Sequence, residues 1–397
     1  MAASLADHAV TAVTSPTLLF VGQRSPAFEA ARRLGYRVVC VDEKPPSRRL
    51  ATGLAGFISC PFSPVTRWDE VAARIAATGP VTAVFALTER SVVPAAFLRN
   101  ALGVPGDTPD AALRATDKLL MKRTVAAAGI ACARFCDASG EALSRDDLLA
   151  ELGLPLVCKA RVSSGGRLNR ICRAPTELPR RLARDWMAEA FVPGEEMSLE
   201  SFVQDGEPVF TNLTEYFVPR WANILPAALP EGERLAVEDL NRRVIRALGL
   251  VSGFTHLELF RTAKGPVFGE IAARPPGGHL TELMQLAYGF DPWEAWFRVE
   301  QGERLALPPR ARQSAGVWVL HPGAGTVVAV RGLEEARQQP GVEAVHCRLR
   351  PGLRVGERLG AGEEKGYILV TGSDRDQVAE RLLRAEHTVA VEMQTAG

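Results

Sequence analysis

Short apolar runs alternate with helix-like segments over the first hundred residues. Strands are predicted at the apolar runs Thr17–Val21, Tyr36–Val41, Val81–Leu87 and the less regular Gly56–Pro61. Helical spacing marks the intervening segments Pro26–Leu34, Trp68–Ala77 and Ser91–Leu102. Strands separated by helices predict a parallel, doubly wound sheet, in which ligands bind at the carboxyl ends of the strands. The segments Gly22-Gln23-Arg24, Asp42-Glu43 and Thr88-Glu89 are therefore expected at the mouth of a site.

The pattern changes after a long helix that is expected to run from Asp107–Pro109 to about Ala128. Strands are predicted at Leu156–Ala160, Leu168–Arg173 and Met187–Val192, with a short helix at Thr176–Arg184. This order of elements predicts a small α+β unit.

Two hairpins and a small terminal region follow. The hairpins are expected over Glu196–Val203 with Pro208–Tyr216, and Gly253–Arg261 with Pro266–Ala272. Helices are expected at Glu233–Leu248, Leu280–Leu286 and Pro292–Glu300. Beyond a linker at Pro308-Pro309, short elements are expected at Ala315–Leu320, Thr326–Val330, Val342–Leu349, Tyr367–Thr371 and Gln377–Arg384.

Composition excludes several classes of partner. The 397 residues carry a formal net charge of +1, so no bulk attraction to nucleic acid or membrane is expected. No apolar stretch is long enough to span a bilayer, and the N-terminal residues read as a frayed tail rather than a signal peptide. The seven cysteines lack C-x-x-C spacing, which fits a reducing cytoplasm better than a disulfide framework or zinc cluster.

The strongest chemical pattern is Glu258 and Glu270 on the two strands of the second hairpin, followed by Arg274. Two carboxylates on adjacent apolar strands are costly unless a cation neutralises them, and Mg²⁺ needs few protein carboxylates. Arg274 could bind phosphate in bidentate fashion. The alternative is a pair of surface carboxylates on a solvated hairpin.

Three further segments suit a nucleotide. Small residues at Ser163-Ser164-Gly165-Gly166 would let backbone N–H groups approach phosphate, although a plain flexible hairpin also fits and no Walker loop is present. Lys159 lies inside an apolar strand and must snorkel or meet an anion. The strand from Glu189 to Val192, closed by Pro193-Gly194, offers backbone groups to an adenine edge, or is only a strand end with a turn.

The order of these features, with Lys118 before them, resembles that of the ATP-grasp superfamily, and more narrowly its carboxylate–amine ligases, which include the L-amino-acid ligases. The resemblance covers about Thr17 to Glu300, and Pro322–Val328 and Leu349–Gly352 resemble the C-terminal domain of those ligases.

The resemblance implies an α/β and α+β fold. It implies a disordered tail at 1–16, an N-terminal Rossmann-like domain at 17–112 and a C-terminal α+β domain at 308–397. Between them it places an ATP-grasp domain of two α+β subdomains at 113–307, with a mobile lid at about 130–194.

The resemblance also assigns roles to residues. For ATP, these are Lys118 and Lys159 at the phosphates, the loop Ser163, Ser164, Gly165 and Gly166 over them, Glu189, Phe191 and Val192 at adenine, and Glu196 at ribose. Glu258 and Glu270 would hold Mg²⁺, or Mn²⁺ in its place. Arg274, with Lys159, would be catalytic, stabilising the transferred phosphoryl group, and Glu89 would meet a substrate amino group.

Departures from the family pattern concern the metal and the second substrate. Ala272 stands where the family often has Asn, so the metal shell lacks one side-chain oxygen. Asn223 replaces the His of a His-x-x-Pro segment, and Gly277-Gly278 lacks a bulky side chain and would enlarge the amine pocket. His256 shares a strand face with Glu258 and is expected near substrate, although a structural His fits equally well.

The implied function is ATP-dependent amide formation through an acyl-phosphate, with a small-molecule carboxylate and an amine as substrates, one of them an amino acid. The family's habit suggests a homodimer. Carboxylation or formyl transfer on the same fold, and a non-catalytic nucleotide-binding protein, remain alternatives. A NAD-dependent enzyme is disfavoured because Gly22-Gln23-Arg24-Ser25 lacks G-x-G-x-x-G.

Overall fold

The computed structural model describes residues 16–63, 65–166 and 169–394, and its N-terminal part contains the predicted parallel sheet. Its strands, in the order β3-β2-β1-β4, are β1 (Thr17–Val21), β2 (Arg37–Asp42), β3 (Leu54–Ser59) and β4 (Val81–Ala86). The helices between and after them are α1 (Ser25–Arg33), α2 (Arg48–Ala51), α3 (Trp68–Ala76) and α4 (Val92–Leu102). The uninterrupted apolar strands are buried on both faces, as a parallel sheet requires.

The prediction of one long helix from Asp107–Pro109 to Ala128 is wrong. The chain forms two helices, α5 (Pro109–Arg114) and α6 (Lys118–Ala127). Thr108 caps the first helix, and the Asp117 side chain accepts hydrogen bonds from the N–H groups of Leu119 and Leu120 to cap the second. Asp117 therefore starts a new helix, with Lys118 at its first position.

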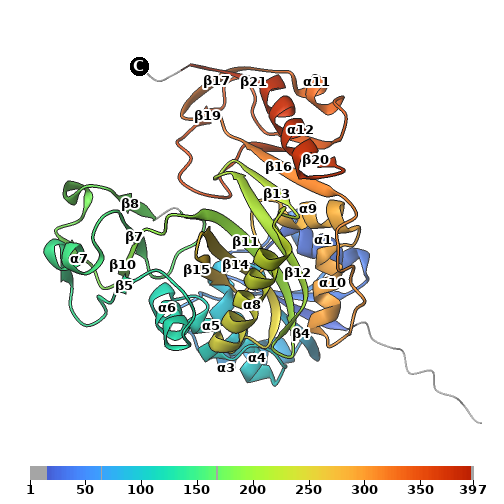
Figure 1. The fold of residues 1–397 in the computed structure, drawn as a ribbon. Helices are drawn as coiled ribbons and strands as arrows, with labels where there is room; N and C mark the ends of the chain where they lie inside the picture. The colour runs from blue at the N-terminus through green and yellow to red at the C-terminus, as the bar shows by residue number, and fades with distance from the viewer. Residues whose placement is uncertain (1–15, 64, 167–168, 395–397) are drawn as a thin grey trace, which may run out of the picture.

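Residues 130–194, which we call the lid region, form the expected small α+β unit around their own core. An antiparallel sheet has the order β5 (Phe135–Cys136), β10 (Trp186–Ala190), β7 (Leu156–Ala160) and β8 (Arg170–Cys172). The predicted start of the last strand, Leu168, lies outside the described residues. Figure 1 shows this unit projecting from the rest of the molecule.

The sequence reading missed one lid helix and misplaced another. Helix α7 (Arg145–Leu152), capped by Ser144, was not predicted. The helix predicted at Thr176–Arg184 is wrong: a single 3-10 turn, η2 (Pro175–Glu177), is followed by β9 (Arg181–Leu182), which pairs with β6 (Leu143–Ser144). Pro179 explains the break, because the residue before a proline is disfavoured in a helix.

Both predicted hairpins lie in one long antiparallel sheet. Within the described residues its eight strands run β15 (Gly265–Ala272), β14 (Ser252–Thr262), β11 (Glu195–Gln204), β12 (Glu207–Val218), β13 (Ala222–Leu225), β16 (Ser314–Leu320), β20 (Gly366–Gly372) and β18 (Val342–Cys347). Helix α8 (Glu231–Leu248) covers one face. Glu258 and Glu270 are direct partners across β14 and β15.

The unpredicted strand β13 joins the C-terminal region to the central sheet, since it pairs with β12 on one side and β16 on the other. Helix α12 (Arg375–Thr388) packs on β16 and β20, and α11 (Leu333–Arg337) packs on β18. A second small sheet contains β19 (Arg354–Val355), β17 (Gly325–Arg331) and β21 (Ala390–Gln394). The predicted fold class is confirmed: an N-terminal parallel sheet, a central antiparallel sheet and a C-terminal α+β region (Figure 1).

An aromatic core fixes the N-terminal sheet against the segment that follows β15. Helices α9 (Leu280–Tyr288) and α10 (Pro292–Glu300) belong to the same core as β1 and β4. Phe85 packs edge-on against Trp296 at 4.9 Å and against Phe297 at 4.9 Å between ring centres. This packing places the ends of β1 and β4 beside the loop that carries Arg274. Among the described helices none has the length and apolarity needed to cross a membrane.

Candidate active site

A buried cluster of two lysines and one glutamate joins the lid region to α6. Lys159 on β7 and Lys122 on α6 both reach Glu189 on β10, with N–O distances of 2.6 and 3.1 Å. Burial opposes ionisation of Glu189, but the two lysines outweigh it and hold its pKa below the usual value. The pKa of Lys159 is raised by Glu189 and Glu270 despite burial. For Lys122, burial outweighs Glu189 and lowers the pKa.

Lys122 was missed by the sequence reading. It follows Lys118 by four residues on α6, so both point from the same helix face. That spacing, once the helix start is placed correctly, is the signal that could have found it. Both lysines contact the Glu189 carboxylate. The predicted role of Glu189 toward adenine stays a prediction.

Lys118 is buried, and its ammonium contacts one metal-ligand candidate, Glu270, and the glycine loop. Its Nζ lies 3.1 Å from Glu270 and donates a hydrogen bond of 2.7 Å to the carbonyl of Ser163. Lys118 therefore faces this cluster rather than solvent, and its role at the phosphates stays a prediction. The cap residue Asp117 is held by Arg161, whose Nε donates to it at 3.1 Å.

Glu258 and Glu270 form the like-charged pair that the sequence predicted. Burial raises the pKa of Glu270, Lys118 opposes this, and the charge of Glu258 raises it further. Burial also acts on Glu258, but the hydrogen bond and charge of His256 outweigh it, so the pKa of Glu258 is lowered. The described residues contain no group of three or more His, Cys, Asp or Glu that could hold a metal. The two carboxylates nonetheless fit Mg²⁺, which completes its shell with phosphate oxygens and water.

His256 belongs to a buried polar network. Its Nδ1 lies 3.0 Å from Glu200 and its Nε2 lies 3.5 Å from Glu258. Glu200, fully buried on β11, also accepts hydrogen bonds of 2.7 Å from Ser198, Asn212 and Thr214. Burial lowers the pKa of His256, but its bonds to Glu200 and Glu258 outweigh burial and raise it to about 9.

The network gives His256 a structural anchor next to a predicted metal ligand. Glu200 was missed by the sequence reading. The polar residues that alternate with apolar ones at Ser198 and Glu200, and at Asn212 and Thr214, are a signal for a buried polar face.

Arg274 meets Glu89 across the interface between the central sheet and the N-terminal domain. Its Nε donates to the Glu89 carboxylate at 2.8 Å, so the two predicted substrate-side residues lie together. Arg24, after β1, donates to the carbonyls of Pro275 at 2.9 Å and of Pro276. Its guanidinium lies over the Trp293 ring, 5.3 Å from the centre. Burial and the charge of Arg274 lower the pKa of Arg24 to about 10.

The glycine loop and the glycines after Arg274 both face other parts of the chain closely. The N–H of Ala361, from the C-terminal region, donates to the carbonyl of Gly165 at 3.2 Å. Gly278 has a φ of +60°, and a Cβ there would lie 3.3 Å from the Asn223 amide nitrogen. Ser164, Gly166 and Gly277 are exposed. Asn223 lies on β13, opposite Val317.

The strand predicted over Met187–Val192 ends two residues early, because β10 stops at Ala190. The N–H of Phe191 donates to the carbonyl of Pro155 at 3.1 Å, and Phe191 and Val192 are partly buried. Glu196 stays accessible, yet crowding by surrounding protein, with the charge of Glu258, raises its pKa to about 7. A carboxylate with a raised pKa beside the metal-ligand candidates marks a site where negative charge is concentrated.

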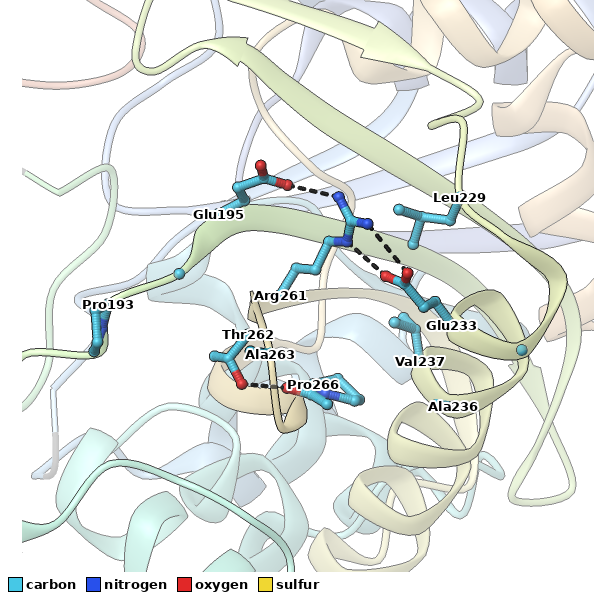
Figure 2. A pocket seen from close by; sticks show the side chains of 13 residues that line it. Pro193, Glu195, Leu229, Glu233, Ala236, Val237, Arg261, Thr262, Ala263 and Pro266 are labelled. Carbon is cyan, nitrogen blue, oxygen red and sulfur yellow. Dashed lines mark hydrogen bonds and ion pairs between the residues drawn. The ribbon is translucent and has the colours of Figure 1, made fainter.

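A separate pocket of about 560 Å³ lies on the α8 side of the hairpin. Figure 2 shows Arg261 held between Glu195 and Glu233 at this pocket, with N–O distances of 2.9 and 2.6 Å. Arg261 lies three residues after Glu258 on β14, so the two side chains lie on opposite faces of the strand. The pocket is therefore distinct from the cluster of lysines and carboxylates described above.

Comparisons with known proteins agree with this geometry. Residues 28–106 match the model of the ATP-grasp N-terminal domain, residues 169–282 the ATP-grasp domain, and residues 317–394 the L-amino acid ligase C-terminal domain 2. The chain is 30% identical to a formate-dependent phosphoribosylglycinamide formyltransferase from Anaeromyxobacter dehalogenans, over 66% of this chain and 69% of that protein. The chain belongs to the ATP-grasp superfamily.

Two further relatives narrow the comparison within this superfamily. The L-arginine-specific L-amino acid ligase of Bacillus subtilis is 24% identical over 78% of this chain and 80% of that protein. An uncharacterised protein, y4rH, of Sinorhizobium fredii is 28% identical over 72% of this chain, and the match covers 63% of that protein's length. The crystal structure of an L-amino acid ligase from Bacillus licheniformis has a TM-score of 0.80 and 20% identity, covering 96% of this chain and 99% of that one.

The chain is thus similar to an ATP-grasp protein that is an L-amino acid ligase, and it shares the fold of another such ligase. These relatives favour an enzyme over the non-catalytic nucleotide-binding protein left open above. The roles of individual residues in this ATP-grasp protein remain predictions, which the geometry supports by bringing the lysines, carboxylates and Arg274 together.

Proposed function

We propose that this protein joins a carboxylate to an amine through an acyl-phosphate, with an amino acid as one substrate, and releases ADP and phosphate. The observation that carries the proposal is the assembly of Glu258, Glu270, Lys118 and Lys159 on one side and the Arg274–Glu89 pair on the other. The first group suits a polyphosphate and its cation, and the second suits a substrate with carboxylate and ammonium groups.

In the first step the carboxylate oxygen of the donor attacks the γ-phosphorus of ATP, and ADP leaves. The ammonium groups of Lys118 and Lys159 already contact carboxylates inside the protein. They can therefore exchange a carboxylate partner for a phosphate oxygen without becoming exposed to solvent. Arg274 would stabilise charge on the transferred phosphoryl group, and Glu89 beside it would bind the donor's ammonium.

Glu258 and Glu270 would hold the divalent cation, Mg²⁺ or Mn²⁺, and when bound it would neutralise phosphate charge. The buried His256–Glu200 pair keeps the Glu258 carboxylate in place from behind. Ala272, on the same strand face as Glu270, supplies no oxygen.

The glycine loop would close over the phosphates with its backbone N–H groups. The Ser163 carbonyl is already fixed by Lys118, which ties the loop to the helix that begins at that lysine. The strand end at Phe191 and Val192 would present backbone groups to adenine, with Glu196 near the ribose.

Phosphate release from Mg-ATP with amino acids offered singly and in pairs tests the proposal. Pair-dependent release, with the dipeptide found by mass spectrometry, is expected. Glu270→Ala and Arg274→Ala should reduce release to background, while the matched surface change Glu392→Ala, on β21, should leave it intact. Near-normal turnover in either active-site variant would show that the assignment is wrong.

Formyl transfer or carboxylation is the second candidate, because the Anaeromyxobacter relative is a formate-dependent phosphoribosylglycinamide formyltransferase. The same assay distinguishes it: release that depends on formate or bicarbonate, and not on amino acids, would favour this candidate.

The proposal includes a cytoplasmic location and a homodimer. The free, mostly buried cysteines of the described residues suit a reducing compartment. Sedimentation velocity of the purified chain would decide the oligomeric state.

A further inference from the structure

His279 is the first side chain beyond the two glycines that follow Arg274, and its position is unusual. It has a φ of +61°, in the left-handed region that residues other than glycine rarely adopt. The residue before it, Gly278, lies against Asn223. His279 is therefore on the wall where the second substrate is expected, and its backbone is held there at a cost.

The imidazole of His279 is held by three groups from two segments. Its Nδ1 lies 3.2 Å from Glu282, one turn along α9, and its ring packs on Tyr367 of β20 with 3.9 Å between ring centres. Its Nε2 lies 3.9 Å from Glu364, which is longer than a hydrogen bond. Among the described residues, Glu282, Glu364 and Tyr367 are the titratable groups that face the ring. Arg24 acts on Glu282 from the N-terminal domain, and Arg358 acts on Glu364.

Glu282 is itself oriented, because Thr281 donates to its other oxygen at 2.8 Å. Burial opposes its ionisation, but the hydrogen bond from His279 outweighs burial, and the pKa of Glu282 is lowered to about 2. A fixed carboxylate at Nδ1 favours the tautomer with the proton on Nδ1, which leaves the Nε2 lone pair as a proton acceptor.

We propose that His279, positioned by Glu282 and Tyr367, is the general base for the acceptor amine, and that Glu364 binds the incoming ammonium group. This inference rests on the proposed ligase function. The acceptor amine arrives as an ammonium, which cannot attack, and Glu364 beside Nε2 supplies the charge that attracts it.

The proton balance is as follows. Nε2 takes one proton from the ammonium, and the freed lone pair forms the C–N bond to the acyl carbon. The bond from that carbon to the phosphate oxygen breaks with its electron pair on the phosphate, which takes the second N–H proton. His279 then returns its proton to solvent, so no oxidant or further reactant is needed.

Hydroxylamine separates this step from acyl-phosphate formation, because it is largely uncharged at neutral pH and attacks without a base. His279→Gln should form hydroxamate from amino-acid donors within about twofold of the wild type. With an amino acid as acceptor, its kcat should fall about 100-fold or more, the usual contribution of a general base.

His346 provides a matched control, because it also packs against Tyr367, at 5.4 Å between ring centres, but is exposed. His346→Gln should resemble the wild type in both reactions. Glu364→Gln should raise KM for the acceptor more than it changes kcat.

The outcomes are distinguishable. Normal amide formation by His279→Gln, or loss of hydroxamate together with amide, would overturn the role of His279 while leaving the ligase function in place. If the wild type forms no hydroxamate with any carboxylate, the proposed function and this inference both fail.

Discussion

Replacing Glu189 by Gln tests whether one carboxylate supports two buried cations between the lid region and α6. Glutamine keeps the size of the side chain and removes its charge, which leaves Lys122 and Lys159 facing each other inside the protein. Removing one partner of a buried ion pair costs about 3–5 kcal/mol, because the remaining charge stays desolvated. Both lysines are less than a tenth exposed, so the upper part of this range is expected.

The penalty should depend on pH in a defined direction. In the wild type, Glu189 contributes stability above its unfolded pKa of about 4.5 and loses it as pH falls through the lower folded value. In the variant, the lysines lose the charge that favours their protonated forms, so their folded pKa values drop. The unfolded chain then binds more protons than the folded one, and stability rises with pH. The deficit should therefore narrow as pH rises toward the unfolded lysine pKa of about 10.5.

Thermal melting of the purified protein measures the effect. A loss of 3–5 kcal/mol corresponds to a fall of about 6–10 °C at about 2 °C per kcal/mol. Lys122→Met leaves the Lys159–Glu189 pair intact and removes a desolvated charge, so it should cost about 1 kcal/mol or less. Glu141→Gln neutralises an exposed lid carboxylate and should change nothing measurable. If Glu189→Gln melts like Glu141→Gln, or if Lys122→Met is the worse variant, the charge argument is refuted.

Other predictions concern the metal ligands and the residues that hold them. Glu200→Gln should lower the pKa of His256 from about 9. The raised pKa stabilises the wild-type fold below the unfolded pKa of about 6.5, and this stabilisation is lost toward pH 9. Equilibrium unfolding should therefore show the variant to be less stable than the wild type at about pH 6 and nearly equal to it above about pH 9. Ala272→Asn should restore a missing oxygen and lower the Mg²⁺ concentration for half-maximal phosphate release several-fold; an unchanged Mg²⁺ titration would contradict this. Arg24→Lys keeps the charge, but a lysine cannot donate to both carbonyls as the arginine fork does. Phosphate release should fall about tenfold with little change in melting temperature. An undiminished rate would show that the loop carrying Arg274 does not need Arg24.

Much of the fold follows from local sequence patterns. The parallel sheet was predictable because its strands are continuous apolar runs between helical segments. The second hairpin was predictable because its turn residues lie between two strand-like segments. The pairing of Glu258 with Glu270 does not follow from the turn alone, because a bulge between Glu258 and Leu259 shifts the hairpin register by one residue. These features depend on residues close in sequence.

The errors arose where tertiary contacts or capping decide the structure. Asp117 caps α6 with its own side chain, and its carboxylate is held by Arg161 of the lid region, 44 residues away. Strand β13 has only four residues, and its place is fixed by β12 and β16 on either side. Lys122 and Glu200 have their roles through partners on other helices and strands, so the sequence around each residue does not identify it.

The continuous sheet through β13 has a consequence for how this chain can be recombined. Pro308-Pro309 looks like a clean exchange point between related proteins, yet an exchange there would replace β16, the strand that pairs with β13. Where the incoming strand does not fit, the N–H and C=O groups of β13 are left as an open sheet edge, which favours aggregation. The C-terminal region is therefore best exchanged together with β13, so that the paired strands β13 and β16 come from the same protein.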